Sequence, residues 1–373
     1  MPTPTPHLFT PFTLRELTLK NRVVVSPMCQ YSSDDGLPTD WHLVHLGSRA
    51  VGGAALVIVE ATGVSPEGRI SPDDSGIWSD DHARAFQPIT RFIKENGSVP
   101  GVQLAHAGRK ASTDAPWRGG RPLPAADPRA WQPIAPSPVP FDAGYPEPRE
   151  MTRDDIERLV TDFTAAARRS LDAGFEDVEL HMAHGYLLHE FLSPLANRRT
   201  DDYGGSLANR MRFPLRVVGA AREAWPAKWP VFVRLSCTDW AEGGWDLPQS
   251  IEFVRMLRDV GIDLIDCSSG GNVARAQIPV GPGYQVPFAE AIRREAGIPT
   301  GAVGLITEPR QAEQIVASGR ADCVLLARAF LRDPYWALHA ADELGAESAW
   351  PVQYVRARNP SPRAETAPPP TRK

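Results

Sequence analysis

The chain has 373 residues, 42% of them hydrophobic, which is enough to bury a sizeable core in one large domain or two ordinary ones. Its 40 basic and 45 acidic residues give a formal charge of −5, and no run of like charge is long enough to indicate binding to nucleic acid or to a membrane. A small-molecule partner is therefore expected.

The N-terminus and the cysteines indicate the compartment. The first residues, "MPTPTPHLFTPFTL", lack the basic and continuous apolar regions of a secretory signal, and no later segment approaches about 18 uninterrupted apolar residues. We therefore expect a cytoplasmic protein. Four isolated cysteines, with no C-x-x-C pair among them, are expected to be free thiols: Cys29, Cys237, Cys267 and Cys323.

In chain order, the first predicted element is a hairpin over Leu8 to Leu19, "LFTPFTLRELTL", which we expect to close the bottom of the fold. Short apolar runs rich in β-branched residues then predict eight strands, at 22–28, 55–61, 99–106, 175–181, 230–236, 263–269, 300–306 and 321–328. Segments with helical periodicity lie between the strands and several of them end on glycine, at 81–97, 153–174, 250–261 and 309–319.

Near-continuous apolar strands that alternate with helices require a parallel sheet that is covered on its outside. Eight such units in one chain favour a single α/β domain, a (β/α)8 TIM barrel, and a doubly wound sheet is the alternative. We assign the barrel to residues 1–360 and expect the Pro-rich segment 361–373 to be a disordered tail. The Pro-rich stretch 111–149 after the third strand is long for a loop and is a candidate lid.

A TIM barrel carries its chemistry at the carboxyl ends of its strands. The predicted strand ends carry Cys29, Ala61, Thr62, Gln103, His106, His181, His184, Arg234, Ser268 to Gly271, Gly304 and Arg328. Gln103 and Arg234 together suit a flat heterocycle with carbonyl and imide edges. Gly304 and Arg328 fit a phosphate site on the last two strands or, alternatively, a tight turn beside a surface arginine. Cys29 alone indicates no more than a small buried side chain.

The segment "ELHMAHGYLLHEF" (179–191) allows several interpretations. His181 and His184 could bind a metal, as in a metal-dependent barrel hydrolase, but a third ligand is hard to find among the neighbouring candidates His106, His189 and Glu190. Alternatively, the two histidines donate hydrogen bonds to one substrate oxygen while Tyr186 supplies a proton, or the pair only stabilises its loop. Schiff-base chemistry is disfavoured, because Lys110 is the one lysine near a strand end.

Longer motifs are more specific: "SPMCQY", "QLAHAGRKA", "HMAHGYLLHEFLSPLANRRTDDYGGSLANR", "SSGG", "GYQVPFAEAIR" and "GRADCVLLARAFLRDPYW". From about Leu8 to Arg356 the chain resembles the old yellow enzyme family of FMN-dependent ene-reductases, in particular its cysteine-containing bacterial branch. The resemblance implies an enzyme that binds FMN, is reduced by NADPH or NADH, and reduces activated C=C bonds of α,β-unsaturated carbonyl compounds, maleimides or nitroalkenes by ping-pong hydride transfer. It also implies a homo-oligomer, either a dimer or a tetramer.

The resemblance further implies which residues form the site. FMN would be held by Pro27, Met28, Cys29, Ala61, Gln103, Arg234, Ser269, Gly270, Gly304, Ala327 and Arg328. His181 and His184 would hold the substrate carbonyl oxygen, Tyr186 would donate the proton, and Cys29 would tune the flavin. Tyr31 and Arg356 would also contact substrate, Arg356 from a neighbouring subunit. Two departures are that Ala327 stands where many relatives have glycine, and that Arg356 is followed by Ala-Arg instead of Gly-Trp.

Overall fold

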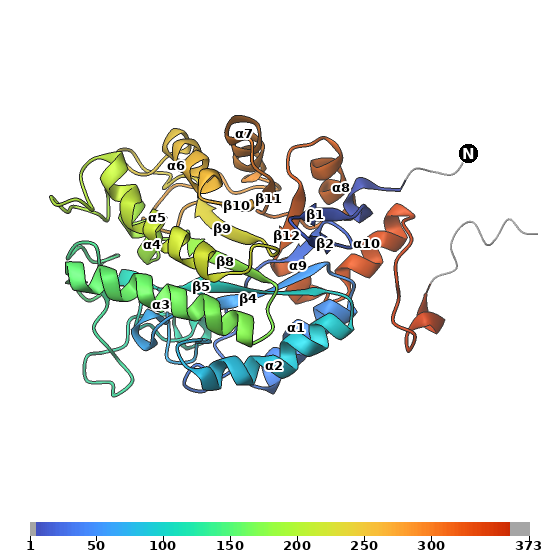
Figure 1. The fold of residues 1–373 in the computed structure, drawn as a ribbon, viewed down its shortest axis with the longest axis horizontal. Helices are drawn as coiled ribbons and strands as arrows, with labels where there is room; N and C mark the ends of the chain where they lie inside the picture. The colour runs from blue at the N-terminus through green and yellow to red at the C-terminus, as the bar shows by residue number, and fades with distance from the viewer. Residues whose placement is uncertain (1–4, 359–373) are drawn as a thin grey trace, which may run out of the picture.

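The structure, a computed structural model, describes residues 5–358. Its main sheet is a closed barrel of eight parallel strands in the order β10-β11-β12-β3-β4-β5-β8-β9 (Figure 1). The barrel strands are β3 (Val23–Val25), β4 (Leu56–Gly63), β5 (Val99–Ala105), β8 (Asp177–Met182), β9 (Val231–Ser236), β10 (Leu264–Ser268), β11 (Thr300–Ala302) and β12 (Cys323–Leu326). Each of the eight predicted runs overlaps one of these strands, so the TIM-barrel prediction is confirmed and the doubly wound alternative is wrong.

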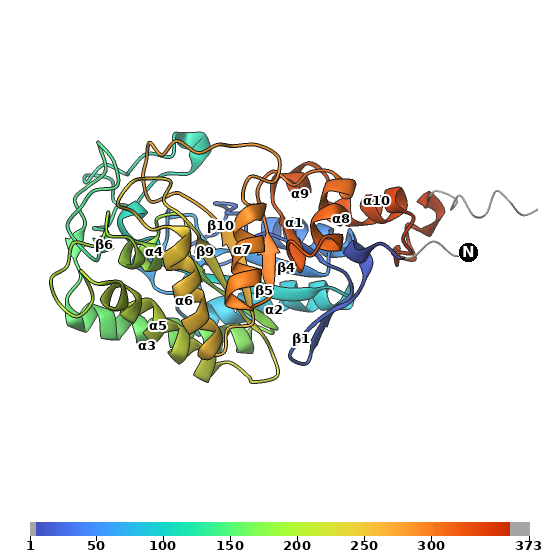
Figure 2. The same ribbon diagram turned by 90° about the horizontal axis from the view of Figure 1, so that it is seen from above.

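Helices surround the barrel, as Figure 1 and the turned view in Figure 2 show. They are α1 (Asp40–Val51), α2 (Asp80–Glu95), α3 (Arg153–Asp172), α4 (Leu187–Leu192), α5 (Leu207–Ala224), α6 (Leu247–Asp259), α7 (Val286–Ala296), α8 (Pro309–Ala317), α9 (Arg328–Arg332) and α10 (Trp336–Leu344). After α3 and α6 the chain turns through Gly174 and Gly261, whose φ angles of 90° and 96° are left-handed values that glycine adopts without strain. None of the helices within residues 5–358 has the length and apolar character needed to cross a bilayer.

The alternation of side chains along each strand divides the apolar core into two clusters. Outward-facing residues such as Val178, Val233 and Ile265 pack against helix residues such as Phe163 and Phe213. Inward-facing residues, among them Val24, Leu56 and Phe232, form a second cluster inside the barrel. The barrel interior is therefore filled by side chains on its amino-terminal side and does not form a pore.

The predicted hairpin is also confirmed, and it completes this inner cluster. Strands β1 (Phe12–Leu14) and β2 (Leu17–Leu19) pair antiparallel through a short turn. Leu14 and Leu19 lie in the same cluster as the inward-facing strand residues, and both are buried. The hairpin thus covers the amino-terminal end of the barrel with apolar side chains.

The Pro-rich segment 111–149 is an ordered excursion with little regular structure. It contains a 3-10 turn at Pro116–Arg118 and the short strand β6 (Ile134–Ala135), which pairs with β7 (Arg149–Glu150). In Figure 2 this excursion lies at the opposite side of the molecule from the β1–β2 hairpin. Its role as a lid stays a prediction. The assignment of the barrel to 1–360 and of a tail to 361–373 extends beyond the described residues.

The inner cluster predicts a stability effect for Leu19, which is 1% exposed. Leu19→Ala removes buried apolar atoms and leaves a cavity that the neighbouring side chains cannot fully fill. We therefore expect it to lower the free energy of unfolding by about 2–5 kcal/mol. Thr18→Ala, at the exposed neighbouring position, should change it by less than about 0.5 kcal/mol. Urea unfolding of both variants measures the difference, and equal midpoints would contradict the role of the hairpin as a structural floor.

Candidate active site

The carboxyl ends of the strands bring together residues that are far apart in the sequence. Cys29 follows β3, Ala61 lies in β4, and Tyr186 lies just before α4, yet all three belong to one small apolar cluster. The cluster also contains Trp131 of the Pro-rich excursion, together with Ile70, Ala105, Ala107 and Ala111. The excursion therefore supplies part of the apolar wall beside the predicted catalytic residues.

His181, His184 and Tyr186 form a compact aromatic group at the end of β8. The ring centroid of His181 lies 5.0 Å from that of His184 and 5.1 Å from that of Tyr186, with both pairs in edge-to-face geometry. His181 is buried, and its Nδ1 has no hydrogen-bond partner among the described residues. Such a buried ring nitrogen is available to a bound group.

The backbone of His184 is held in a conformation that favours glycine, with φ of 61°. Its N–H donates to Oγ of Ser236 at 2.9 Å, and its Nε2 lies 2.7 Å from Oγ of Ser268. Lys110 Nζ donates both to the carbonyl of His184 at 2.8 Å and to that of Gly271 at 3.0 Å. These contacts come from residues at or just after the ends of β5, β9 and β10, and together they hold His184 in its strained conformation.

Two glycines allow the loops after β8 and β10 to touch. A Cβ atom at Gly185 would lie 2.3 Å from the carbonyl oxygen of Gly271, and one at Gly271 would lie 2.5 Å from Cα of His184. Both glycines have positive φ angles, of 72° and 90°. Close backbone approach and left-handed conformation together explain why glycine is required at both positions.

The structure does not support the metal interpretation of this segment. His189 Nδ1 accepts a hydrogen bond from the N–H of Gly185 at 2.9 Å, and its Nε2 lies 3.0 Å from a carboxylate oxygen of Asp239. Glu190 accepts from the N–H of Arg109 at 2.8 Å. Both residues thus position the loop, and the described part of the chain contains no cluster of three His, Cys, Asp or Glu residues suited to a metal ion.

Burial sets the protonation states of the aromatic group. Burial, together with the nearby positive charge of Arg234, lowers the pKa of His181 and of His184 well below the usual value, so both rings are neutral near pH 7. Burial raises the pKa of Tyr186 well above 10, so its hydroxyl keeps its proton. Two neutral imidazoles and a protonated phenol can donate hydrogen bonds, and the phenol can donate a proton.

Cys29 carries a partly buried thiol, and the buried carboxylate of Glu60 fixes the loop that contains it. Burial and the charges of Asp74 and Glu60 raise the pKa of its thiol well above the usual value, so the thiolate form is disfavoured. Glu60 accepts a hydrogen bond from the N–H of Gln30, the next residue, and one from Oγ of Ser75 at 2.7 Å. Cys29 is therefore a neutral thiol and not an activated nucleophile.

Tyr31, two residues after Cys29, contacts the excursion. Its ring packs edge-to-face on that of Trp117, with centroids 5.6 Å apart. Its φ angle of 49° turns the chain sharply after Cys29. Tyr31 and Cys29 therefore lie in the same loop, close to the excursion.

Gln103 and Arg234 lie inside the barrel and are both at least 90% buried. Gln103 Nε2 donates to a carboxylate oxygen of Glu179 at 2.7 Å. Arg234 Nη1 donates to Oγ of Ser26 at 3.0 Å, and its Nε lies 3.1 Å from a carboxylate oxygen of Asp266. The remaining polar atoms of these two side chains are fixed in orientation and can serve a bound group.

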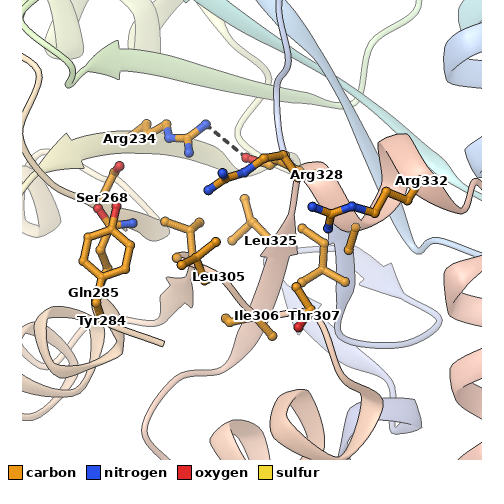
Figure 3. Close-up of a pocket in the computed structure, with 16 residues that line it drawn as sticks. Arg234, Ser268, Tyr284, Gln285, Leu305, Ile306, Thr307, Leu325, Arg328 and Arg332 are labelled. Atoms are coloured by element: carbon orange, nitrogen blue, oxygen red, sulfur yellow. Dashed lines mark hydrogen bonds between the residues drawn. The ribbon is translucent and has the colours of Figure 1, made fainter. Parts of the chain in front are cut away.

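A pocket of about 200 Å³ lies beside Arg234 at the ends of β10, β11 and β12. Arg234, Arg328 and Arg332 lie along this pocket in Figure 3, and no carboxylate is among its described lining residues. Gly304 and Ala327 also line it. Arg234 is paired with Asp266, but Arg328 and Arg332 form no ion pair among the described residues, and unpaired arginines in a pocket suit a dianionic phosphate group. Because α9 has only five residues, we attribute the positive potential to the arginine side chains and not to the helix.

The remaining predicted residues lie near this pocket, except for one. Pro27 and Met28 precede Cys29, and Ser269 and Gly270 follow β10. Ser269 Oγ donates to the side-chain oxygen of Gln285, a pocket residue, at 2.6 Å. Arg356 is exposed in a 3-10 turn at Val355–Ala357, which Figure 1 places beyond α10 and away from the strand ends of its own chain.

Several residues of the site escaped sequence analysis. The sequence indicated Lys110 only as a candidate for Schiff-base chemistry, but its side chain donates hydrogen bonds to the loops after β8 and β10. Tyr284 and Arg332 lie inside two of the longer motifs but were not singled out, and Ser236 and Trp131 carried no local signal. Arg332 stands four residues after Arg328, one helical turn away, and this spacing could have suggested a second pocket arginine.

Comparison with known proteins gives strong matches over nearly the whole chain. The sequence model of the NADH:flavin oxidoreductase / NADH oxidase family matches residues 7–347. An NADPH dehydrogenase of Geobacillus thermodenitrificans is 51% identical over 94% of this chain and 98% of its own length. An NADPH dehydrogenase of Bacillus subtilis is 47% identical over the same shares.

Solved structures show the same likeness at lower identity. Morphinone reductase in complex with tetrahydroNAD superposes with a TM-score of 0.76 and 29% identity, and the match covers 93% of each chain. An old yellow enzyme homologue from Zymomonas mobilis superposes with a TM-score of 0.74 and 28% identity, and the match covers 92% of this chain and 94% of that one.

The contact between the β8 and β10 loops yields a prediction for Gly271→Ala. The added methyl group meets the backbone of His184, so we expect a loss of more than about 1 kcal/mol in the free energy of unfolding and faster amide hydrogen exchange in residues 183–186. Gly281→Ala, in the same loop but with open space around it, is the matched control. Unchanged exchange in the Gly271→Ala variant would contradict the constraint.

Proposed function

The chain belongs to the NADH:flavin oxidoreductase / NADH oxidase family and is an oxidoreductase, and we propose that it uses FMN and NADPH or NADH to reduce the activated C=C bond of small unsaturated carbonyl compounds, maleimides or nitroalkenes. The observation that carries this proposal is the group of two neutral histidines and one protonated tyrosine at the carboxyl end of β8, next to Arg234. This arrangement polarises a carbonyl group and supplies a proton.

The residues present fit FMN at both ends of the cofactor. Gln103 and Arg234 would hold the edge of the ring system that carries carbonyl and imide groups, with backbone groups of Pro27, Met28, Ala61, Ser269 and Gly270 around it. Gly304, Ala327 and Arg328 would hold the phosphate, and Arg332 adds a second positive charge to the same pocket. Bound FMN would supply hydride transfer from the nicotinamide to the alkene.

Protein side chains would perform the remaining steps. His181 and His184 donate hydrogen bonds to the carbonyl oxygen of the substrate and stabilise the negative charge that develops on it. Tyr186 donates its proton to the α-carbon. Cys29, held as a thiol, contacts the cofactor and modulates its potential without forming a covalent bond. Tyr31 contacts the substrate from the side of the excursion.

An anaerobic titration tests the proposed function directly. The purified holoprotein should lose its flavin absorbance when NADPH is added and regain it when cyclohexenone is added. A flavoprotein that does not turn over would fail at one of these steps. A colourless protein with a hydrolytic activity that a chelator abolishes would instead support a metal-dependent hydrolase.

Arg328→Ala should weaken FMN binding more than ten-fold. The change removes a charge-assisted contact to phosphate, worth about 1.5–3 kcal/mol. Arg310→Ala removes an arginine that is exposed and paired with Glu343, and it should leave FMN binding unchanged. The dissociation constant of FMN, measured on the apoproteins by fluorescence, decides between the two results. Equal affinities would contradict the phosphate assignment.

Tyr186→Phe should slow reduction of the alkene by about 10²–10⁴-fold, because the tyrosine donates its proton to the alkene. Reduction of the bound flavin by NADPH does not use this proton and should stay nearly unchanged. Tyr335→Phe, next to the start of α10, is the matched control for loss of a phenol hydroxyl. Stopped-flow absorbance separates the two half-reactions. If only the reaction with NADPH became slower, Tyr186 would be a nicotinamide contact instead.

Arg356 is proposed to reach the active site of a neighbouring subunit in a homo-oligomer, since it lies away from the site of its own chain. Arg356→Ala should then raise KM for the alkene while the oligomer stays intact. Sedimentation velocity at micromolar concentration measures assembly, and steady-state kinetics measures KM. A monomer with full activity would refute the proposal.

A further inference from the structure

Four polar side chains meet inside the barrel, above the apolar floor. Gln103 comes from β5, Glu179 from β8, Arg234 from β9 and Asp266 from β10. Their exposed fractions are 2%, 0%, 8% and 0%, respectively. We call these four residues the interior polar layer. Two of them, Glu179 and Asp266, have no role in the proposed function.

The two carboxylates contact the two residues proposed to hold the FMN ring. Glu179 Oε1 accepts from Gln103 at 2.7 Å, and Asp266 Oδ2 lies 3.1 Å from Nε of Arg234. The contact between Asp266 and Arg234 is an ion pair without hydrogen-bond alignment, since neither oxygen of Asp266 has a hydrogen-bond partner among the described residues. Oε2 of Glu179 also lacks such a partner.

The charges in this layer do not balance. Two carboxylates face one guanidinium, and a third buried carboxylate, Asp177, lies two residues before Glu179 on β8. An ionised carboxylate that is buried without donors is strongly disfavoured, and two that repel each other are more so. Of the other groups near the pair, the thiol of Cys323 on β12 is neutral, and the side chains of Gln103 and Ser26 carry no charge. The layer is therefore expected to retain a proton.

We propose that Glu179 and Asp266 are positioning residues that share one proton beneath Gln103 and Arg234, and that take up or release this proton as the charge held by Arg234 changes. The inference rests on the proposed function, because the changing charge is that of the group that Gln103 and Arg234 bind. The proton comes from solvent and binds to the carboxylate pair, whereas the hydride from NADPH would go to the cofactor.

The direction of the proton linkage follows from the electrostatics. Burial raises the pKa of Glu179 well above its usual value, and repulsion from Asp266 raises it further. Burial also raises the pKa of Asp266 to about 6. The positive charge of Arg234 opposes both shifts. A negative charge added next to Arg234 offsets the guanidinium and raises these pKa values further. The pair has one pKa before the negative charge is added and a higher pKa afterwards. Proton uptake is therefore expected at pH values between these two, and not at pH values below or above them.

The test is the pH dependence of the midpoint potential of the FMN-loaded protein, measured over about pH 6 to 9. It gives the number of protons taken up per two electrons. Glu179→Gln keeps an oxygen that can accept from Gln103 but cannot titrate, so it should take up as much as one proton fewer than the wild type. That difference changes the reduction equilibrium by as much as tenfold, or 29.6 mV, per pH unit.

Asp162→Asn is the control, because burial also raises the pKa of Asp162 but this residue lies on α3, outside the barrel, and the change should leave the proton number unchanged. The same number of protons in Glu179→Gln and wild type, with FMN bound in both, would overturn the inference. Failure of the wild type to bind FMN would instead overturn the proposed function.

Infrared spectroscopy of the wild-type apoprotein gives an independent result if Glu179→Gln does not fold. A C=O band of a protonated carboxyl group from the pair should persist above pH 7, and Asp266→Asn, which removes the repulsion, should shift its titration to lower pH. Asp177 and Glu190, whose pKa values burial also raises, contribute equally to both spectra and cancel in the difference between wild type and Asp266→Asn. A difference spectrum without a C=O band that titrates differently in the two proteins would contradict a shared proton.

Discussion

Pairing of β12 with β3 closes the sheet, and the rest of the structure depends on this closure. A closed parallel barrel places all eight carboxyl ends at one face, so residues between Cys29 and Arg332 meet within a single site. Closure also gives each strand an outward face and an inward face. The outward surface binds helices, whereas the inward surface is filled by the hairpin below and by polar side chains above.

Arg234 supplies the fixed positive charge around which the polar residues are organised. It is buried beside Asp266, and its field disfavours protonation of His181 and His184. Burial acts in the same direction on the histidines and keeps Tyr186 and Cys29 protonated. The site thus presents neutral hydrogen-bond donors around one guanidinium, an arrangement suited to carbonyl polarisation and to a flavin, and unsuited to binding a cation.

Backbone contacts between loops hold these groups in place. Gly185 and Gly271 permit the loops after β8 and β10 to touch, and Lys110 links both loops to the one after β5. Asp239, after β9, contacts His189 and accepts from the side chain of Asn272 at 3.3 Å. These contacts join the loops after β5, β8, β9 and β10 around His184.

The sequence by itself determined the architecture, because strand and helix periodicity, the apolar hairpin and the positions of the strand ends are local properties. It also identified Gln103, Arg234 and the segment from His181 to Tyr186 as polar groups at strand ends. Long motifs then distinguished a flavin site from a metal site, which spacing alone had left open.

Tertiary structure decided what depends on contacts between distant segments. Periodicity predicted that Glu179 and Asp266 lie in strands, but not that both lie near Arg234, since β8, β9 and β10 must pair before the two carboxylates come close to this residue. In the same way, Trp131 and Lys110 gained a place in the site only when their loops folded over β8. Protonation states belong to this second class, because burial and the field of Arg234 exist only in the folded chain.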